Sequence, residues 1–107
     1  MKRLALAALL SLSLGAFAQD KTDFAIAIKD HKFSPDRIEV PAGKKVKLVV
    51  DNQDATPEEF ESHSMKVEKV IPGKSKATIF IGPLKAGEYK FVGEFNEKTA
   101  KGVIVAK

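Results

Sequence analysis

Residues 33–52 read FSPDRIEVPAGKKVKLVVDN, and this stretch decides the fold. Apolar and polar side chains alternate in two runs, residues 38–40 and 46–50. Alternation with a period of two is typical of a half-buried β-strand. Between the runs, Pro41-Ala42-Gly43 is a turn signal. The stretch therefore predicts two short strands joined by a tight turn.

The same pattern extends outward in both directions. Residues 24–28 alternate before it, and short apolar runs follow at residues 77–81, 89–91 and 103–105. Gly and Pro separate these runs, and no window beyond residue 18 keeps a helical period. We therefore predict an all-β fold, an antiparallel Greek-key β-sandwich of about seven strands. The positions expected in its core are Phe24, Ile26, Ile28, Phe33, Ile38, Val40, Val46, Leu48, Val50, Ile79, Tyr89, Phe91, Val103 and Val105.

The first 18 residues have the pattern of an export signal. Met1-Lys2-Arg3 is a positive start, residues 4–14 are almost wholly apolar, and Ala16-Phe17-Ala18 matches the small-x-small rule for cleavage. The alternative is a membrane anchor, but the apolar run is shorter than the roughly 20 residues that span a bilayer. We predict a signal peptide at residues 1–18 and one domain at residues 19–107.

Composition excludes several classes of protein. The chain has no Cys, which rules out disulfides, thiolate metal sites and thiol catalysis. Removing Lys2 and Arg3 from the 18 basic residues leaves 16 against 14 acidic ones, a net charge of +2. The lysines are scattered and form no stripe with aromatics, so nucleic-acid binding is not indicated.

Candidate metal ligands gather at residues 59–65. Glu59, Glu61, His63 and Met65 share one parity, so on an extended strand they point to the same face, opposite to Phe60. Carboxylates with an imidazole suit Fe, Mn or Cu(II) rather than Cu(I). The alternative is a solvated acidic surface, which is the usual role of such residues. Paired carboxylates also occur in glycosidases, but a domain of this size offers little room for a sugar cleft.

Two runs of sequence resemble the cupredoxins. They are FxPxxIxVxxGxxV at residues 33–46, and GxYxF at residues 87–91 followed by GVIV at residues 102–105. In cupredoxins these runs belong to the two halves of a Greek-key sandwich that together hold copper. The resemblance places Gly93 at the cysteine ligand, Asn96 at the second histidine, Glu59 near the first histidine and Lys101 near the axial methionine. A type 1 blue copper site is therefore not expected.

A narrower resemblance concerns DNQDATPEEFES at residues 51–62 and GEF at residues 93–95, with KVIPG at 69–73 and IGPL at 81–84. These segments resemble the cupredoxin-like periplasmic proteins of bacterial high-affinity iron-uptake systems. The resemblance implies a location in the periplasm. It also implies two partners, a high-affinity iron permease and a second periplasmic metal-binding protein. In this group a His is expected after Gly-Glu-Phe, and Asn96 departs from that.

Together with the candidate ligands, this resemblance implies a periplasmic metal-binding protein that assists iron oxidation or delivery, as a binding or electron-transfer accessory rather than an enzyme. The predicted ligands of an iron or copper ion are Glu59, Glu61, His63 and Glu94, with Met65, His31 and Asn96 as secondary candidates. For Met65 the alternative is core packing, and for His31 it is a turn. Two alternative functions stay open, a periplasmic copper-buffering protein and a metal-free interaction module.

Overall fold

A computed structural model describes residues 21–107 of the protein. The predicted signal peptide lies outside the described residues. The elements in chain order are β1 (Asp23–Lys29), β2 (Lys32–Ser34), β3 (Arg37–Val40), β4 (Val46–Asn52), β5 (Glu58–Ser62), β6 (Val67–Ile71), β7 (Ser75–Ile81), β8 (Gly87–Gly93), the 3-10 turn η1 (Glu94–Asn96) and β9 (Lys101–Ala106). Within this part of the chain, no helix is long and apolar enough to cross a membrane.

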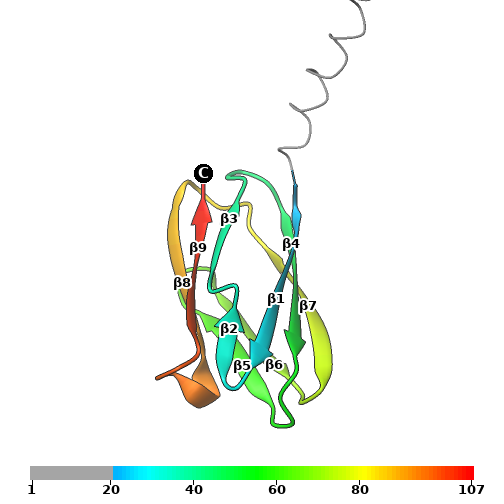
Figure 1. The fold of residues 1–107 in the computed structure, drawn as a ribbon. Helices are drawn as coiled ribbons and strands as arrows, with labels where there is room; N and C mark the ends of the chain where they lie inside the picture. The colour runs from blue at the N-terminus through cyan, green and yellow to red at the C-terminus, as the bar shows by residue number, and fades with distance from the viewer. Residues whose placement is uncertain (1–20) are drawn as a thin grey trace, which may run out of the picture.

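The strands form two facing sheets (Figure 1). One sheet has the order β2-β1-β4-β7 and the other β3-β9-β8-β5-β6. The predicted all-β Greek-key sandwich is confirmed. The described residues contain nine strands rather than about seven, partly because the three residues around Phe33 pair with β1 as the short strand β2. The pairing is also mixed, since β1 runs parallel to β4 and β3 runs parallel to β9.

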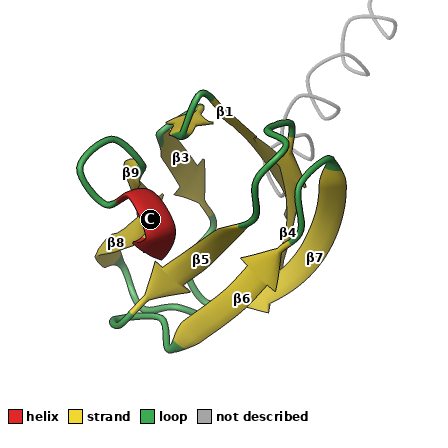
Figure 2. Ribbon diagram, turned by 90° about the horizontal axis from the view of Figure 1, so that it is seen from below, coloured by secondary structure: helices red, strands yellow, loops and turns green. Residues whose placement is uncertain are grey.

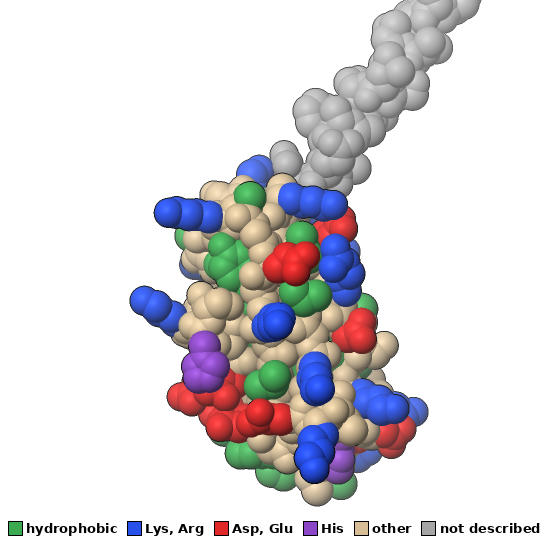
Figure 3. Space-filling view, turned by 90° about the vertical axis from the view of Figure 1, so that its left-hand side faces the viewer, with side chains coloured by type: hydrophobic (Ala, Val, Ile, Leu, Met, Phe, Trp, Pro, Cys, Tyr) green, Lys and Arg blue, Asp and Glu red, His purple; other side chains and the backbone are tan. Residues whose placement is uncertain are grey.

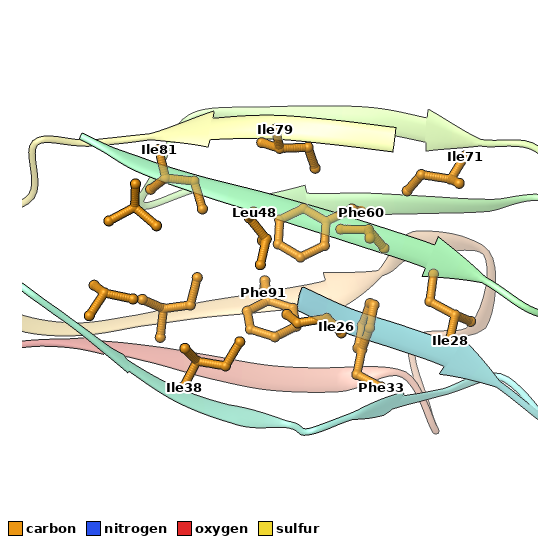
Figure 4. Close-up of a cluster of buried hydrophobic side chains, with 14 of the residues drawn as sticks. Ile26, Ile28, Phe33, Ile38, Leu48, Phe60, Ile71, Ile79, Ile81 and Phe91 are labelled. Atoms are coloured by element: carbon orange, nitrogen blue, oxygen red, sulfur yellow. The ribbon is translucent and has the colours of Figure 1, made fainter. Parts of the chain in front are cut away.

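Apolar side chains from both sheets fill the space between them (Figure 4). Three aromatic rings lie at its centre: Phe33 meets Phe60 and Phe91 edge-on at 5.9 and 4.9 Å, and Phe60 stacks on Phe91 at 4.8 Å between ring centroids. Such pairs stabilise a core beyond the burial of their area.

The predicted core holds with three exceptions: Phe24, Tyr89 and Val103 are only partly buried. In β9, Ile104 and Ala106 pack into the core at 1% and 2% exposure, and Val105 is also buried. Residues 103–105 are all apolar, so the sequence does not show which of them face the core. The pairing of β9 between β3 and β8 decides it.

Three loops meet at one end of the sandwich, where β5 begins. Asp54 accepts hydrogen bonds from the N–H groups of Asp30 at 2.8 Å and His31 at 3.0 Å, in the turn between β1 and β2. The Thr99 hydroxyl donates to the carbonyl oxygen of His31 at 2.7 Å. The loop after β8 starts with η1, which lies beside β5 (Figure 2). These bonds fix the end of the molecule that carries the candidate site.

Candidate functional site

Strand β5 sends its glutamates to opposite faces. Glu58, Phe60 and Ser62 are buried at 1%, 0% and 2% exposure, whereas Glu59 and Glu61 are partly exposed on the outer face. This is the parity that the sequence predicted. It follows from the pleat, because Phe60 fills the core and its neighbours must then point outward.

Four carboxylates gather on the outer face, and we call Glu59, Glu61, Glu68 and Glu94 the acidic cluster. Glu59, Glu68 and Glu94 each offer an oxygen within 4.8 Å of the other two. Glu61 lies directly opposite Glu68 in the pairing of β5 with β6, so these two side chains share that face. Acidic side chains gather with a histidine at one edge of the molecule, while lysines are spread over the face in view (Figure 3).

Crowding of negative charge shows in the acid–base behaviour of the cluster. A hydrogen bond with Glu94, followed by partial burial and the charges of Glu94, Glu68 and Glu61, raises the pKa of Glu59 from 4.5 to about 7. Partial burial and then the charge of Glu94 raise the pKa of Glu61, against the opposing effect of His63. Like charges at this spacing favour uptake of a proton. A bound cation would relieve the same repulsion.

His63 stands at the edge of the cluster. Its Nε2 atom is 3.8 Å from Oε2 of Glu61, with the histidine side chain 93% exposed and that of Glu61 12% exposed. Neither His63 nor His31 belongs to the group of described residues whose ligand atoms lie within 4.8 Å. An exposed imidazole can turn about its own bonds, so His63 is placed to join Glu61 but is not held there.

The secondary candidates have structural roles. Met65 is partly buried against the core, and its N–H donates to the Ser62 hydroxyl at 3.2 Å. His31 adopts a left-handed backbone with φ of 59°, in the turn that Asp54 caps. Asn96 points its amide inward and donates from Nδ2 to Oε2 of Glu58 at 2.7 Å.

A single buried carboxylate, that of Glu58, lies on the inner side of β5, behind the acidic cluster. The Glu58 carboxylate accepts three hydrogen bonds, from the N–H of Glu59 at 3.0 Å, the N–H of Phe95 at 2.9 Å and Nδ2 of Asn96 at 2.7 Å. A Cβ atom at Gly93 would come within 2.6 Å of the Glu58 carboxyl carbon and 2.7 Å of the Ala100 Cβ. The side chain that meets Gly93 and Asn96 is therefore that of Glu58, not Glu59 as the sequence resemblance placed it.

Sequence reasoning overlooked Glu68 and the hydrogen bonds of Glu58. Glu68 joins the cluster only through the register of β5 with β6, which pairs it with Glu61. A hairpin of residues 58–71 with a turn at residues 63–66 would have suggested this pairing. The parity of β5 already put Glu58 on the Phe60 side, but its partners come from a loop far along the chain.

The sequence pattern of the cupredoxin-like domain family matches residues 2–106. The chain belongs to the cupredoxin-like domain family. An uncharacterized protein of Rickettsia prowazekii (strain Madrid E) is 45% identical to this cupredoxin-like chain over 80 residues, which cover 75% of the chain and 64% of the relative. The chain thus spans less than two thirds of that relative's length.

Solved structures share the sandwich. Auracyanin A, a "blue" copper protein from Chloroflexus aurantiacus, superposes with a TM-score of 0.67 at 12% identity over 79% of this chain and 98% of its own. The metal binding domain of the Cu(I) exporting P-type ATPase CopA from Streptococcus pneumoniae D39 gives 0.68 at 15% identity over 79% and 84%. The purple cupredoxin from Nitrosopumilus maritimus gives 0.59 at 19% identity over 79% and 100%. At these identities the similarity shows the cupredoxin-like fold.

A blue copper centre does not fit the residues of this cupredoxin-like domain. Such a centre needs a Cys thiolate and two imidazoles, and the chain has no Cys. Gly93 and Asn96 both lie against the buried Glu58 carboxylate, which Phe95 and Asn96 already hold by hydrogen bonds. The oxygen-rich outer face is the part of this end that suits a harder cation.

Proposed function

We propose that this protein is a periplasmic metal-binding cupredoxin-like protein that receives Fe(II) and assists its oxidation or its delivery to an iron permease. The observation that carries the proposal is the acidic cluster, in which oxygens of Glu59, Glu68 and Glu94 lie within 4.8 Å of one another. Glu61 and His63 stand beside them.

Electrostatics favour a cation at this position. Four carboxylates share one outer face, and the pKa of Glu59 is raised to about 7 because Glu94 shares a hydrogen bond with it and adds its charge. Each of these groups is more stable beside a positive charge than beside another carboxylate. A cation held by three or more oxygens would replace the proton that Glu59 otherwise takes up.

The same electrostatics favour Fe(III) over Fe(II), since the attraction to carboxylates grows with the charge of the ion. Stabilising Fe(III) makes the loss of one electron from Fe(II) easier, with dioxygen or a partner protein as the acceptor. Export, the periplasm and the two partners, an iron permease and a second periplasmic metal-binding protein, come to this proposal from the sequence resemblance. Here iron is cargo, and the protein needs no resident copper.

A titration of the metal-free protein with Fe(II) under argon, followed by air, tests the proposal. Wild-type protein should bind Fe(II) stoichiometrically and produce Fe(III) faster than the buffer alone does, with dioxygen taking up the electrons and protons to form water. The double variant Glu59→Gln/Glu94→Gln removes two of the three converging carboxylates, and we expect its Fe(II) affinity to fall by roughly tenfold or more.

Glu39→Gln is the matched control, because it removes a carboxylate that pairs with Lys107 at 3.2 Å, outside the acidic cluster. Its Fe(II) affinity should equal that of wild type. Equal affinity in the Glu59→Gln/Glu94→Gln variant would instead show that iron binds elsewhere. Tight Cu(II) binding does not separate copper buffering from iron handling, because Cu(II) heads the affinity series at almost any such site. The rate of Fe(III) formation does separate them.

A metal-free interaction module is the second candidate, and two exposed apolar residues favour it. Val70 is 49% exposed and lies opposite Glu59, and Phe95 is 52% exposed and follows Glu94 in the chain. Apolar side chains beside charged ones are common where a partner docks. If wild-type protein binds neither Fe(II) nor Cu(II) in the titration above, this second function replaces the first.

A further inference from the structure

The buried carboxylate of Glu58 binds the backbone at two places that carry residues of the acidic cluster, one on β5 and one in the loop after β8. Oε1 of Glu58 accepts the N–H of Glu59 at 3.0 Å and the N–H of Phe95 at 2.9 Å. Glu59 is one carboxylate of the cluster, and Phe95 directly follows Glu94, which is another. Glu59 and Glu94, whose carboxyl oxygens lie within 4.8 Å of each other on the outer face, are thus held through the backbone by the same oxygen on the inner face.

The loop after β8 is itself a closed unit. Gly93 donates to the carbonyl oxygen of Ala100 at 2.9 Å, and Ala100 donates to that of Asn96 at 2.8 Å. Asn96 then fastens this unit to β5 through its 2.7 Å bond to Oε2 of Glu58. Gly93 lacks a side chain, and any Cβ there would displace the Glu58 carboxyl group. The loop approaches β5 closely only because position 93 is glycine.

Stability alone does not explain a buried glutamate at position 58. Replacing a buried charged group and its partners by apolar side chains is often neutral or even stabilising. Glu58 is 1% exposed in a strand whose next inward residue is Phe60, so an apolar side chain would suit the sandwich. What an apolar side chain could not do is accept hydrogen bonds from residues on both strand and loop.

We propose that Glu58 is a positioning residue of the acidic cluster, which sets Glu94 against Glu59 by binding the Phe95 N–H and the Asn96 side-chain amide from the opposite face. This inference rests on the proposed function, because it concerns how that cation site is assembled. Asn96 is the second member of the device. Its side-chain amide donates the 2.7 Å bond to Oε2 of Glu58.

Asn96→Asp tests the proposal, because it sets a carboxylate against the Glu58 carboxylate. At pH 7.5 the two repel, the loop should detach from β5, and hydrogen exchange at the Phe95 amide should accelerate by roughly tenfold or more. Fe(II) affinity, measured under argon, should fall by a similar factor. Simple electrostatics predicts the opposite sign, since the added negative charge would strengthen the binding of a cation.

The double variant Glu58→Gln/Asn96→Asp should restore the contact between the loop and β5. The amide introduced at position 58 can donate to the carboxylate introduced at position 96, while its oxygen still accepts from the Phe95 N–H. The net charge of the double variant equals that of wild type. Phe95 protection and Fe(II) affinity should return most of the way. Ile104→Val is the stability control, because it removes a buried methyl group in β9 and should lower the free energy of unfolding without changing Fe(II) affinity.

The proposal is overturned if Asn96→Asp binds Fe(II) as tightly as wild type or more tightly, or if the double variant stays as weak as Asn96→Asp. Should Asn96→Asp not fold, Glu58→Gln takes its place, because a glutamine offers one acceptor oxygen where the Glu58 carboxylate uses both of its oxygens. Faster Phe95 exchange in this variant supports the proposal, and unchanged exchange overturns it. Wild-type protein that binds no Fe(II) while its Phe95 amide is protected would refute the proposed function, leaving the placement of the loop by Glu58 intact.

Discussion

The N–H of Phe95 donates a 2.9 Å hydrogen bond to Oε1 of Glu58, although the two residues lie 37 positions apart in the chain. The bond crosses from the loop after β8 to the inward face of β5, directly under the outward-facing Glu59. The backbones that carry Glu59 and Glu94 therefore cannot separate without breaking bonds in the interior. Protons and cations can relieve the repulsion between their carboxylates, and the first two predictions depend on this.

Fe(II) affinity should rise with pH between about pH 5.5 and about pH 7 and then level off. Glu59, with its pKa raised to about 7 by the hydrogen bond and charge of Glu94, holds a proton at low pH that the ion must displace. Each displaced proton adds up to about a tenfold change in affinity per pH unit. Competition with a chromophoric chelator at several pH values measures this. Affinity independent of pH would place the ion away from Glu59.

Glu59→Gln should stabilise the metal-free protein above pH 7 relative to wild type. A carboxyl whose pKa is raised from 4.5 in the unfolded chain to about 7 in the fold contributes stability that is complete below pH 4.5 and is lost as the pH rises to about 7. The Gln variant does not titrate, so it escapes this loss. Melting curves of both proteins from pH 4 to 8 check this prediction. The Tm of the variant minus that of wild type should increase as the pH rises. Parallel curves for the two proteins would argue against the Glu59–Glu94 contact.

Gly93→Cys should not create a blue copper centre. A Cβ at this position meets the Glu58 carboxyl carbon at 2.6 Å and the Ala100 Cβ at 2.7 Å, so the variant should lose about 1–3 kcal/mol of unfolding free energy. The neighbouring ligand positions hold Glu58 and Asn96 rather than imidazoles. After addition of Cu(II), the absorption spectrum should lack the intense thiolate-to-copper band. Wild type is the colourless control. Appearance of that band in the variant would refute the conclusion that this end of the fold does not suit a blue copper centre.

Asn52→Ala should destabilise the protein by about 2–3 kcal/mol, the effect of leaving several buried groups unpaired. Asn52 is fully buried, and its Nδ2 atom donates to the carbonyl oxygens of Thr56 at 2.9 Å and Ile71 at 3.0 Å. It thereby joins the loop before β5 to the end of β6. Urea denaturation gives the loss, and Gln53→Ala in the exposed neighbouring position should change stability by less than about 0.5 kcal/mol.

The sequence was informative where one face of a strand is apolar and the other polar. Alternation around Ile38 and Leu48 predicted strands and buried positions that the structure confirms. It failed in β9, where three apolar residues in succession left the phase open and Ile104 turned inward in place of Val103. It also missed β2, because three residues around Phe33 are too few for a periodic signal.

For the candidate site, the sequence determined the parity of β5, which sets Glu59 and Glu61 on one face with Glu58 on the other, because successive side chains of a strand must alternate. The absence of Cys likewise excluded a blue copper centre before any fold was known. Only the tertiary structure decided that Glu68 joins the cluster and that Glu58 binds Phe95 and Asn96. Those contacts depend on strand register and on the close approach of a distant loop, and neither is encoded in the local pattern of residues.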